Sequence, residues 1–146
     1  MNQVHTCYIA IGSNLSDPQA QAESAIFALH DHAAIELVST SSLYSSRPMG
    51  PQDQPDYINA VVCVRTQLSP LELLDCTQEI EQIHGRERKA QRWGARTLDL
   101  DILLYDDLIM DSERLTIPHY GMKTREFVLY PLHEISPNLV FPDGST

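Results

Sequence analysis

Apolar and polar residues follow two distinct periodicities along this chain, and these periodicities predict a series of strands and helices. A short apolar run at residues 6–11 ends at Gly12, a pattern typical of a buried strand followed by a turn. Asp17 and Pro18 then provide an N-cap and a first helical residue. Apolar residues follow at helical spacing as far as Ala33. The chain therefore begins with a predicted strand and a predicted helix.

Two further strands are predicted in the middle of the chain. Residues 35–44 are rich in serine, threonine and β-branched residues, and residues 57–66 form an almost continuous apolar run. Between them, residues 46–56 contain three prolines and a glycine. A loop of this length inside a compact domain is usually functional or mobile.

The clearest helix begins at a capping box. Ser69 and Glu72 can each cap the backbone of the other, and Pro70 fits the first helical position. Apolar residues continue at helical spacing until Gly85, which we expect to end the helix. After an irregular stretch, residues 97–105 predict another strand.

This order of elements predicts the fold class. Through residue 105 the order is β-α-β-β-α-β, that of the ferredoxin-like split βαβ. We therefore expect an α+β fold with an antiparallel sheet, helices packed on it and extra C-terminal elements. Those elements are a turn at residues 106–112, an extended piece at 115–120 and a helix at 126–134 bent at Pro131. Without a repeat or a linker, residues 1–146 predict a single domain.

Composition excludes several classes of protein. No apolar run approaches the roughly 20 residues of a membrane span, and the first residues lack the pattern of a secretory signal. We therefore expect a cytoplasmic protein with no membrane partner. Cys7, Cys63 and Cys76 form no CxxC motif, and the first two lie in predicted strands. They are interpreted as small core residues and not as metal ligands or disulfides.

The charge distribution predicts a local anion site. The net charge of −10 argues against nucleic acid as a partner. Residues 1–85 contain ten acids and two bases, whereas residues 86–125 contain the other eight bases. This asymmetry indicates a polyanion-binding segment, although a solvated basic loop remains an alternative.

Two aspartates in a predicted strand carry the clearest chemical signal. Asp99 and Asp101 are two residues apart, so both fall on one face of the strand. Adjacent carboxylates in a half-buried strand are costly unless a cation holds them, and Mg²⁺ prefers one or two carboxylates together with phosphate oxygens. Guanidinium donors of the kind that bind phosphate lie just upstream. The alternative is a solvated strand face whose carboxylates pair with these arginines.

Four separated motifs resemble the family of 6-hydroxymethyl-7,8-dihydropterin pyrophosphokinases. They are YIAIGSNL at residues 8–15, GPQDQPDYIN at 50–59, RWGARTLDLD at 92–101 and PHY at 118–120. The resemblance covers nearly the whole chain. It implies transfer of pyrophosphate from ATP to the hydroxymethyl group of the pterin, with release of AMP, as a step of folate biosynthesis.

The resemblance also implies specific roles for site residues. Asp99 and Asp101 would hold two Mg²⁺ ions, and Arg86 and Arg96 would act with them in catalysis. Residues implied to bind ATP as co-substrate are Leu74, Gln78, Glu81, Arg88, Trp93, Arg96, Ile102, Arg114, Leu115, Thr116, His119, Tyr120 and Arg125. Residues implied to bind the pterin are Ser46, Pro48, Met49, Tyr57, Asn59, Trp93 and Phe127, with Tyr57 and Phe127 on either side of the ring.

Simpler roles remain open for several of these residues. Any single arginine can form a surface salt bridge, which contributes roughly 0–1 kcal/mol. His119 can be a structural histidine, and Tyr57 and Phe127 can be core aromatics. Arg47 stands where the family commonly has a small residue or proline, and a last helix of some relatives is expected to be shortened or absent.

Two other classes of function compete with the enzyme. A ferredoxin-like regulatory module would bind a small ligand without chemistry. A Mg²⁺-dependent phosphodiesterase or nuclease would use the same aspartate pair, but the acidic net charge disfavours binding to nucleic acid. If the protein is the enzyme that the resemblance implies, its partners are small-molecule substrates, and we expect a monomer.

Overall fold

The computed structural model describes residues 4–13, 18–46, 57–83, 98–117, 126–137 and 139, and of residues 18, 46, 57 and 126–130 it describes the backbone alone. The elements in chain order are β1 (His5–Ser13), α1 (Pro18–Asp31), β2 (Ile35–Thr40), β3 (Tyr44–Ser46), β4 (Tyr57–Thr66), α2 (Pro70–Glu81), β5 (Asp99–Tyr105), β6 (Met110–Asp111), β7 (Thr116–Ile117) and α3 (Glu126–Ile135). In this part of the chain, each helix is too short or too polar to cross a membrane.

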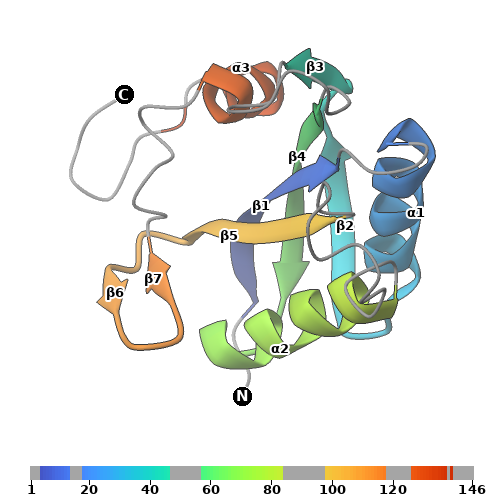
Figure 1. The fold of residues 1–146 in the computed structure, drawn as a ribbon. Helices are drawn as coiled ribbons and strands as arrows, with labels where there is room; N and C mark the ends of the chain where they lie inside the picture. The colour runs from blue at the N-terminus through green and yellow to red at the C-terminus, as the bar shows by residue number, and fades with distance from the viewer. Residues whose placement is uncertain are drawn as a thin grey trace.

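A mixed α+β fold with an antiparallel sheet confirms the predicted class. The main path of the sheet runs β2-β4-β1-β5, and the short β3 pairs with β4 (Figure 1). Each of these pairs is antiparallel, and β1 and β4 occupy the centre. This is the ferredoxin-like arrangement, with β6 and β7 added as a separate two-stranded ladder.

The strand predicted at residues 35–44 is divided in the structure. β2 ends at Thr40, and β3 starts at Tyr44. Between them, the Ser41 hydroxyl oxygen accepts a hydrogen bond from the Val61 amide at 2.9 Å, and the Ser41 amide donates to the Val61 carbonyl at 2.9 Å. A side chain thus replaces a backbone partner at this point, which interrupts the ladder.

The start of α2 agrees with the sequence. In α2, the Ser69 hydroxyl accepts from the Glu72 amide and the Glu72 carboxylate accepts from the Ser69 amide, as the capping box predicts. The helix ends at Glu81, and Gly85 lies outside the described residues. Further along, residues 106–112, predicted as a turn, also contain the short strand β6.

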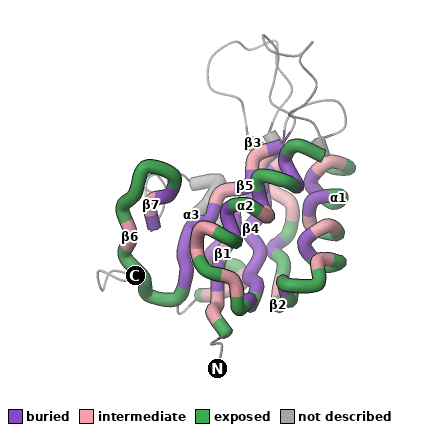
Figure 2. Tube along the Cα trace, turned by 90° about the horizontal axis from the view of Figure 1, so that it is seen from below, coloured by how far each residue is buried: buried purple, intermediate pink, exposed green. Residues whose placement is uncertain are grey.

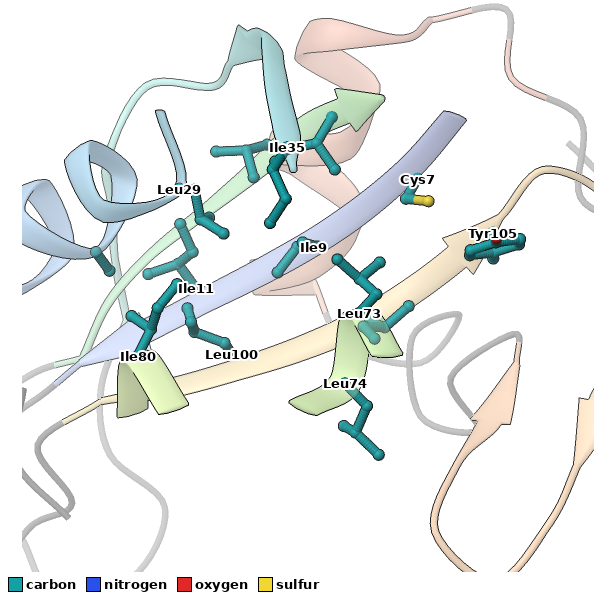
Figure 3. Packing of buried hydrophobic residues seen from close by; sticks show 14 of the residues in the cluster. Cys7, Ile9, Ile11, Leu29, Ile35, Leu73, Leu74, Ile80, Leu100 and Tyr105 are labelled. Atoms are coloured by element: carbon teal, nitrogen blue, oxygen red, sulfur yellow. The ribbon is translucent and has the colours of Figure 1, made fainter. Parts of the chain in front are cut away.

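Two layers of apolar side chains cover the two faces of the sheet. On one face, α1 and α2 pack over β1 and β5, and Figure 3 shows Leu29, Leu73 and Ile80 of the helices meeting Ile9 and Leu100 of the strands. The other face carries the smaller cluster Val61, Leu103, Leu104 and Leu132, the last from α3. Figure 2 shows β4 as largely buried, whereas β2 and α1 alternate between buried and exposed residues.

The cysteines lie where the sequence places them. Cys7 and Cys63 are buried in the sheet, and all three thiols are free. Burial raises the pKa of the Cys7 thiol to about 12. The interpretation of Cys7 and Cys63 as small core residues is confirmed.

Candidate active site

The two aspartates of β5 face away from α1 and α2. Asp99 and Asp101 are half-buried, and they alternate with the buried residues Leu98, Leu100 and Ile102. Those three leucine and isoleucine side chains belong to the core beneath α1 and α2. Successive side chains of a strand point to opposite faces, so both carboxylates lie on the face that α3 covers in part. The predicted shared face of the pair is confirmed.

The neighbouring strands place an amide in the same row of the sheet as one of the carboxylates. Gly12 of β1 pairs with Asn59 of β4 on one side and with Asp99 of β5 on the other. Asn59 lies two residues before Val61, which packs in the α3-side cluster, so Asn59 shares the face of the aspartates. Because glycine has no side chain, β1 places no side chain on the sheet surface between the amide and the carboxylate.

The neighbouring set of paired residues across the sheet also has a small side chain on its central strand. Ala10 of β1 pairs with Val61 on β4 and with Asp101 on β5. The side chains that β1 presents on this face therefore shrink from Tyr8 to Ala10 to Gly12. Ala10 and Gly12 were not predicted as site residues, although the decreasing side-chain size at alternate positions of this strand is a signal for an open surface.

A buried glutamate holds the strand that carries the aspartates. Glu81 of α2 is 7% exposed, and its Oε2 accepts a hydrogen bond from the Leu100 amide at 2.7 Å. β5 is at the edge of the sheet, so an amide that points outward has no neighbouring strand to bind. The Glu81 carboxylate supplies the acceptor midway between Asp99 and Asp101.

Several residues predicted to bind the nucleotide come together between α2 and the β6–β7 ladder. A guanidinium nitrogen of Arg114 donates to Asp75 Oδ1 at 2.7 Å and to Gln78 Oε1 at 3.1 Å. Leu74, Ile102 and Leu115 are buried in one apolar cluster, and Thr116, the first residue of β7, follows Leu115 directly. The members of the predicted set that the structure describes thus lie in one region, and among them the Glu81 carboxylate binds the Leu100 amide of β5.

The described part of the predicted pterin set lies where β3, β4 and α3 meet. Ser46 pairs with Tyr57 in the β3–β4 ladder, and Asn59 pairs with Tyr44 in the same ladder. Phe127 is in the first turn of α3, the helix next to β3 in Figure 1. Their backbone positions bring residues from three separate parts of the chain to one end of the sheet.

Other predicted residues fall outside the described part of the chain. They are Pro48, Met49, Arg86, Arg88, Trp93, Arg96, His119, Tyr120 and Arg125, together with the atypical Arg47. Their predicted roles stay predictions.

The aspartate pair of β5 offers ligands of a kind that magnesium takes. In the described segments, histidine, cysteine and carboxylate side chains form no group of three or more suited to a metal ion. Two carboxylates on one strand face offer oxygen ligands alone, and Mg²⁺ commonly takes one or two carboxylates and completes its shell with phosphate oxygens and water. Asp99 and Asp101 meet that requirement.

Comparison with known proteins decides between the classes of function left open by the sequence. The family model of 7,8-dihydro-6-hydroxymethylpterin-pyrophosphokinase (HPPK) matches residues 8–137. The chain belongs to the HPPK family. This membership makes it a pyrophosphokinase that acts on hydroxymethyldihydropterin in folate biosynthesis, and it excludes a regulatory module without chemistry and a nuclease.

Individual relatives agree with the HPPK assignment. The chain is 57% identical over 139 residues to the 2-amino-4-hydroxy-6-hydroxymethyldihydropteridine pyrophosphokinase of Haemophilus influenzae, a match that covers 95% of this chain and 86% of that protein. It is 48% identical over 141 residues to the enzyme of the same name from Pseudomonas aeruginosa, covering 97% and 86%.

A solved structure supports the fold. The wild-type HPPK-DHPS of Plasmodium falciparum, crystallised with pterin and p-hydroxybenzoate, superposes with a TM-score of 0.72 at 14% identity. The match covers 97% of this chain and 41% of that longer chain. At this identity the likeness concerns the fold alone.

Proposed function

We propose that this HPPK-family enzyme takes its pyrophosphoryl group from ATP and releases AMP, with Asp99 and Asp101 as the ligands of two Mg²⁺ ions. The observation that carries the proposal is the pair of half-buried carboxylates on one face of β5, in register with the small residues Gly12 and Ala10 of β1. Bound there, the metal would neutralise phosphate charge and help align the β-phosphorus for in-line attack by the pterin hydroxyl.

The protein's own share in this mechanism is mainly positioning. Asp99 and Asp101 are fixed on a paired strand, and the bond from Leu100 to Glu81 holds that strand from its outer edge. Side chains on rigid elements keep reacting groups within the narrow geometry that chemistry requires. The proposed metal site therefore depends on a carboxylate that lies on the opposite side of the sheet.

The basic segment would bind the phosphates. The chain contains no GxxxxGK motif, so a P-loop is not available to cradle the triphosphate. In the proposal, Arg86 and Arg96 act with the metal during transfer, Arg88 and Arg125 clamp the phosphates, and His119 and Tyr120 approach them. Arginine suits this task because its planar fork binds phosphate oxygens in pairs.

Adenosine and pterin would then lie on different parts of the fold. For adenosine, the contact between Arg114 and Gln78 supports a site along α2 and β7 that includes Leu74, Glu81, Ile102, Leu115 and Thr116. For the pterin, the position of Asn59 beside Gly12 supports an edge contact. Tyr57 and Phe127 would sandwich the ring, Ser46, Pro48 and Met49 would contact its rim, and Trp93 would cover it.

The nucleotide product tests the proposed reaction. The protein is incubated with ATP, Mg²⁺ and 6-hydroxymethyl-7,8-dihydropterin, and the products are separated by chromatography. We expect AMP and pterin diphosphate in a one-to-one ratio, with little AMP when pterin is omitted. ADP with a pterin monophosphate, or AMP formed equally fast without pterin, would contradict the proposal. In the same proposal the enzyme is a cytoplasmic monomer whose partners are its two small-molecule substrates.

A further inference from the structure

One carboxylate of α3 binds the segment that leads into β3. Glu134 Oε1 accepts a hydrogen bond from the Tyr44 hydroxyl at 2.7 Å, and Oε2 accepts one from the Ser42 hydroxyl at 2.8 Å. The Ser42 amide donates to both oxygens, at 3.0 and 3.1 Å. Three donors from two residues therefore converge on a single side chain, which we name the Glu134 link.

The electrostatics of the Glu134 link favour an ionised acceptor. The bond from Tyr44, followed by the two bonds from Ser42, lowers the pKa of Glu134. Hydrogen bonds to a charged group are shorter and stronger than those between neutral groups. Glu134 is nevertheless exposed, and exposed polar links contribute little to global stability. Its effect should therefore be local.

Two further contacts fasten this end of α3 to the sheet. The Tyr8 hydroxyl on β1 and the Ser136 hydroxyl just after α3 are 2.9 Å apart and share a hydrogen bond. Leu132 packs against Val61 of β4 in the smaller apolar cluster. The C-terminal half of α3 is thus attached to β1 and β4, and through Glu134 to the start of β3.

The elements that the Glu134 link joins are those that carry the proposed pterin residues. β3 continues from Tyr44 to Ser46, and its partner β4 carries Asn59. α3 carries Phe127 seven residues before Glu134, which corresponds to about 10 Å along a helix. A flat ring held between a helix and a sheet edge requires that these two elements keep a fixed separation.

We propose that Glu134 is a positioning residue for pterin binding, because it fixes α3 relative to the β3–β4 edge of the sheet. The inference rests on the proposed function, since it assigns to the pterin the region where these elements meet. Glu134 itself touches no substrate in this proposal. It acts through Ser42 and Tyr44.

Separate binding measurements for the two substrates test the inference. We expect Glu134→Ala to weaken binding of 6-hydroxymethyl-7,8-dihydropterin about tenfold in calorimetry with Mg²⁺ and a non-hydrolysable ATP analogue present, a change that the loss of one charged hydrogen-bond acceptor can produce. Binding of the analogue alone should change by less than about twofold. Glu134→Gln keeps one neutral oxygen acceptor in place of two charged ones, so it should restore part of the pterin affinity.

Two further variants control the experiment. His133→Ala changes an exposed neighbour on the same helix and should leave both affinities unchanged. Tyr44→Phe removes one donor of the Glu134 link, so adding it to Glu134→Ala should weaken binding by less than the sum of the two single effects.

Distinct outcomes separate failure of the inference from failure of the proposed function. If the unaltered protein binds pterin and Glu134→Ala binds it equally well, the inference is wrong and the proposed function stands. An equal loss for pterin and nucleotide, with a lower melting temperature, would mean a merely structural role and also overturn it. If the unaltered protein binds no pterin, the proposed function fails and the inference fails with it.

Discussion

At the scale of single residues, the face of the sheet on which a side chain lies decides its chemistry here. Leu100 lies between Asp99 and Asp101 in sequence, yet its side chain is in the core and the carboxylates are on the other face. The same strand thus supplies a core side chain at Leu100 and the proposed metal ligands at the two positions beside it. A shift of one residue in the pairing with β1 would bury the carboxylates under α2.

Removal of one carboxylate charge should abolish most of the activity without unfolding the protein. We expect Asp99→Asn or Asp101→Asn to lower turnover by at least about a hundredfold, since metal-ion stabilisation is worth several kcal/mol in the transition state. Turnover and Mg²⁺ affinity should be measured together, and circular dichroism should show an unchanged fold. Asp107→Asn, an exposed acid beyond β5, is the matched control. Near-normal turnover in both site variants would exclude the pair as metal ligands.

Residue-level prediction from the sequence succeeded where the signal was local. The shared face of Asp99 and Asp101 and the buried state of Cys7 follow from the period of a strand and the polarity of the neighbours. The Glu134 link was not predicted, because its partners are 92 and 90 residues away in sequence. No local pattern marks such a contact.

At the scale of elements, the ends of helices and strands depend on side chains from other elements. The start of α2 was predictable because Ser69 and Glu72 cap each other within one turn. The break between β2 and β3 was not, because it depends on a bond between Ser41 and the distant Val61. The same is true of the edge of β5, whose outward amide at Leu100 binds Glu81 of a helix.

Loss of the Glu81 carboxylate should loosen the edge of β5. A buried amide left without its acceptor costs about 1–3 kcal/mol, so Glu81→Ala should lower the free energy of unfolding by that amount and speed hydrogen exchange of the Leu100 amide. Glu81→Gln keeps an oxygen acceptor and should have a smaller effect. Glu79→Ala, an exposed position on the same helix, should leave the exchange unchanged. If Leu100 exchanges at the normal rate in Glu81→Ala, this account of the edge is wrong.

At the scale of the whole molecule, the larger apolar cluster and the aspartate pair lie on opposite faces of the sheet. α1 and α2 cover one face with the larger apolar cluster, and the face of the aspartates carries the smaller cluster and α3. The ferredoxin-like order predicted this layering from the sequence. It did not predict how α3 attaches, because the pattern of residues 126–134 gives a helix but no partner.

Stability of the whole fold should decline in alkaline solution. Burial raises the pKa of Cys7 from 9.0 to about 12 and that of Tyr105 from 10.0 to about 12. Because the folded pKa values are the higher ones, their stabilising contribution is complete below pH 9 and is lost as the pH rises towards 12. Urea unfolding at several pH values should show this fall, with a slope of at most about 1.4 kcal/mol per pH unit for each group.

Tyr105→Phe isolates one part of this pH dependence. The variant loses the hydrogen bond from the Tyr105 hydroxyl to the Leu68 carbonyl, so it should be less stable at pH 8. It should also lose part of the decline above pH 10. An unchanged alkaline slope in this variant would show that Tyr105 does not contribute to it.

The strand order also has a consequence for how the enzyme folds during its synthesis. β1 is made first but lies at the centre of the sheet, and it pairs with β4 and β5, which are made much later. During synthesis, Gly12 and Ala10 therefore cannot pair with Asp99 and Asp101 until those residues have left the ribosome. Pairing between such distant segments carries a large loop-closure cost and is slow compared with local helix formation. We therefore expect a chain that is still being made or refolded to form its helices before it gains activity. The first activity should appear only when β5 has paired with β1.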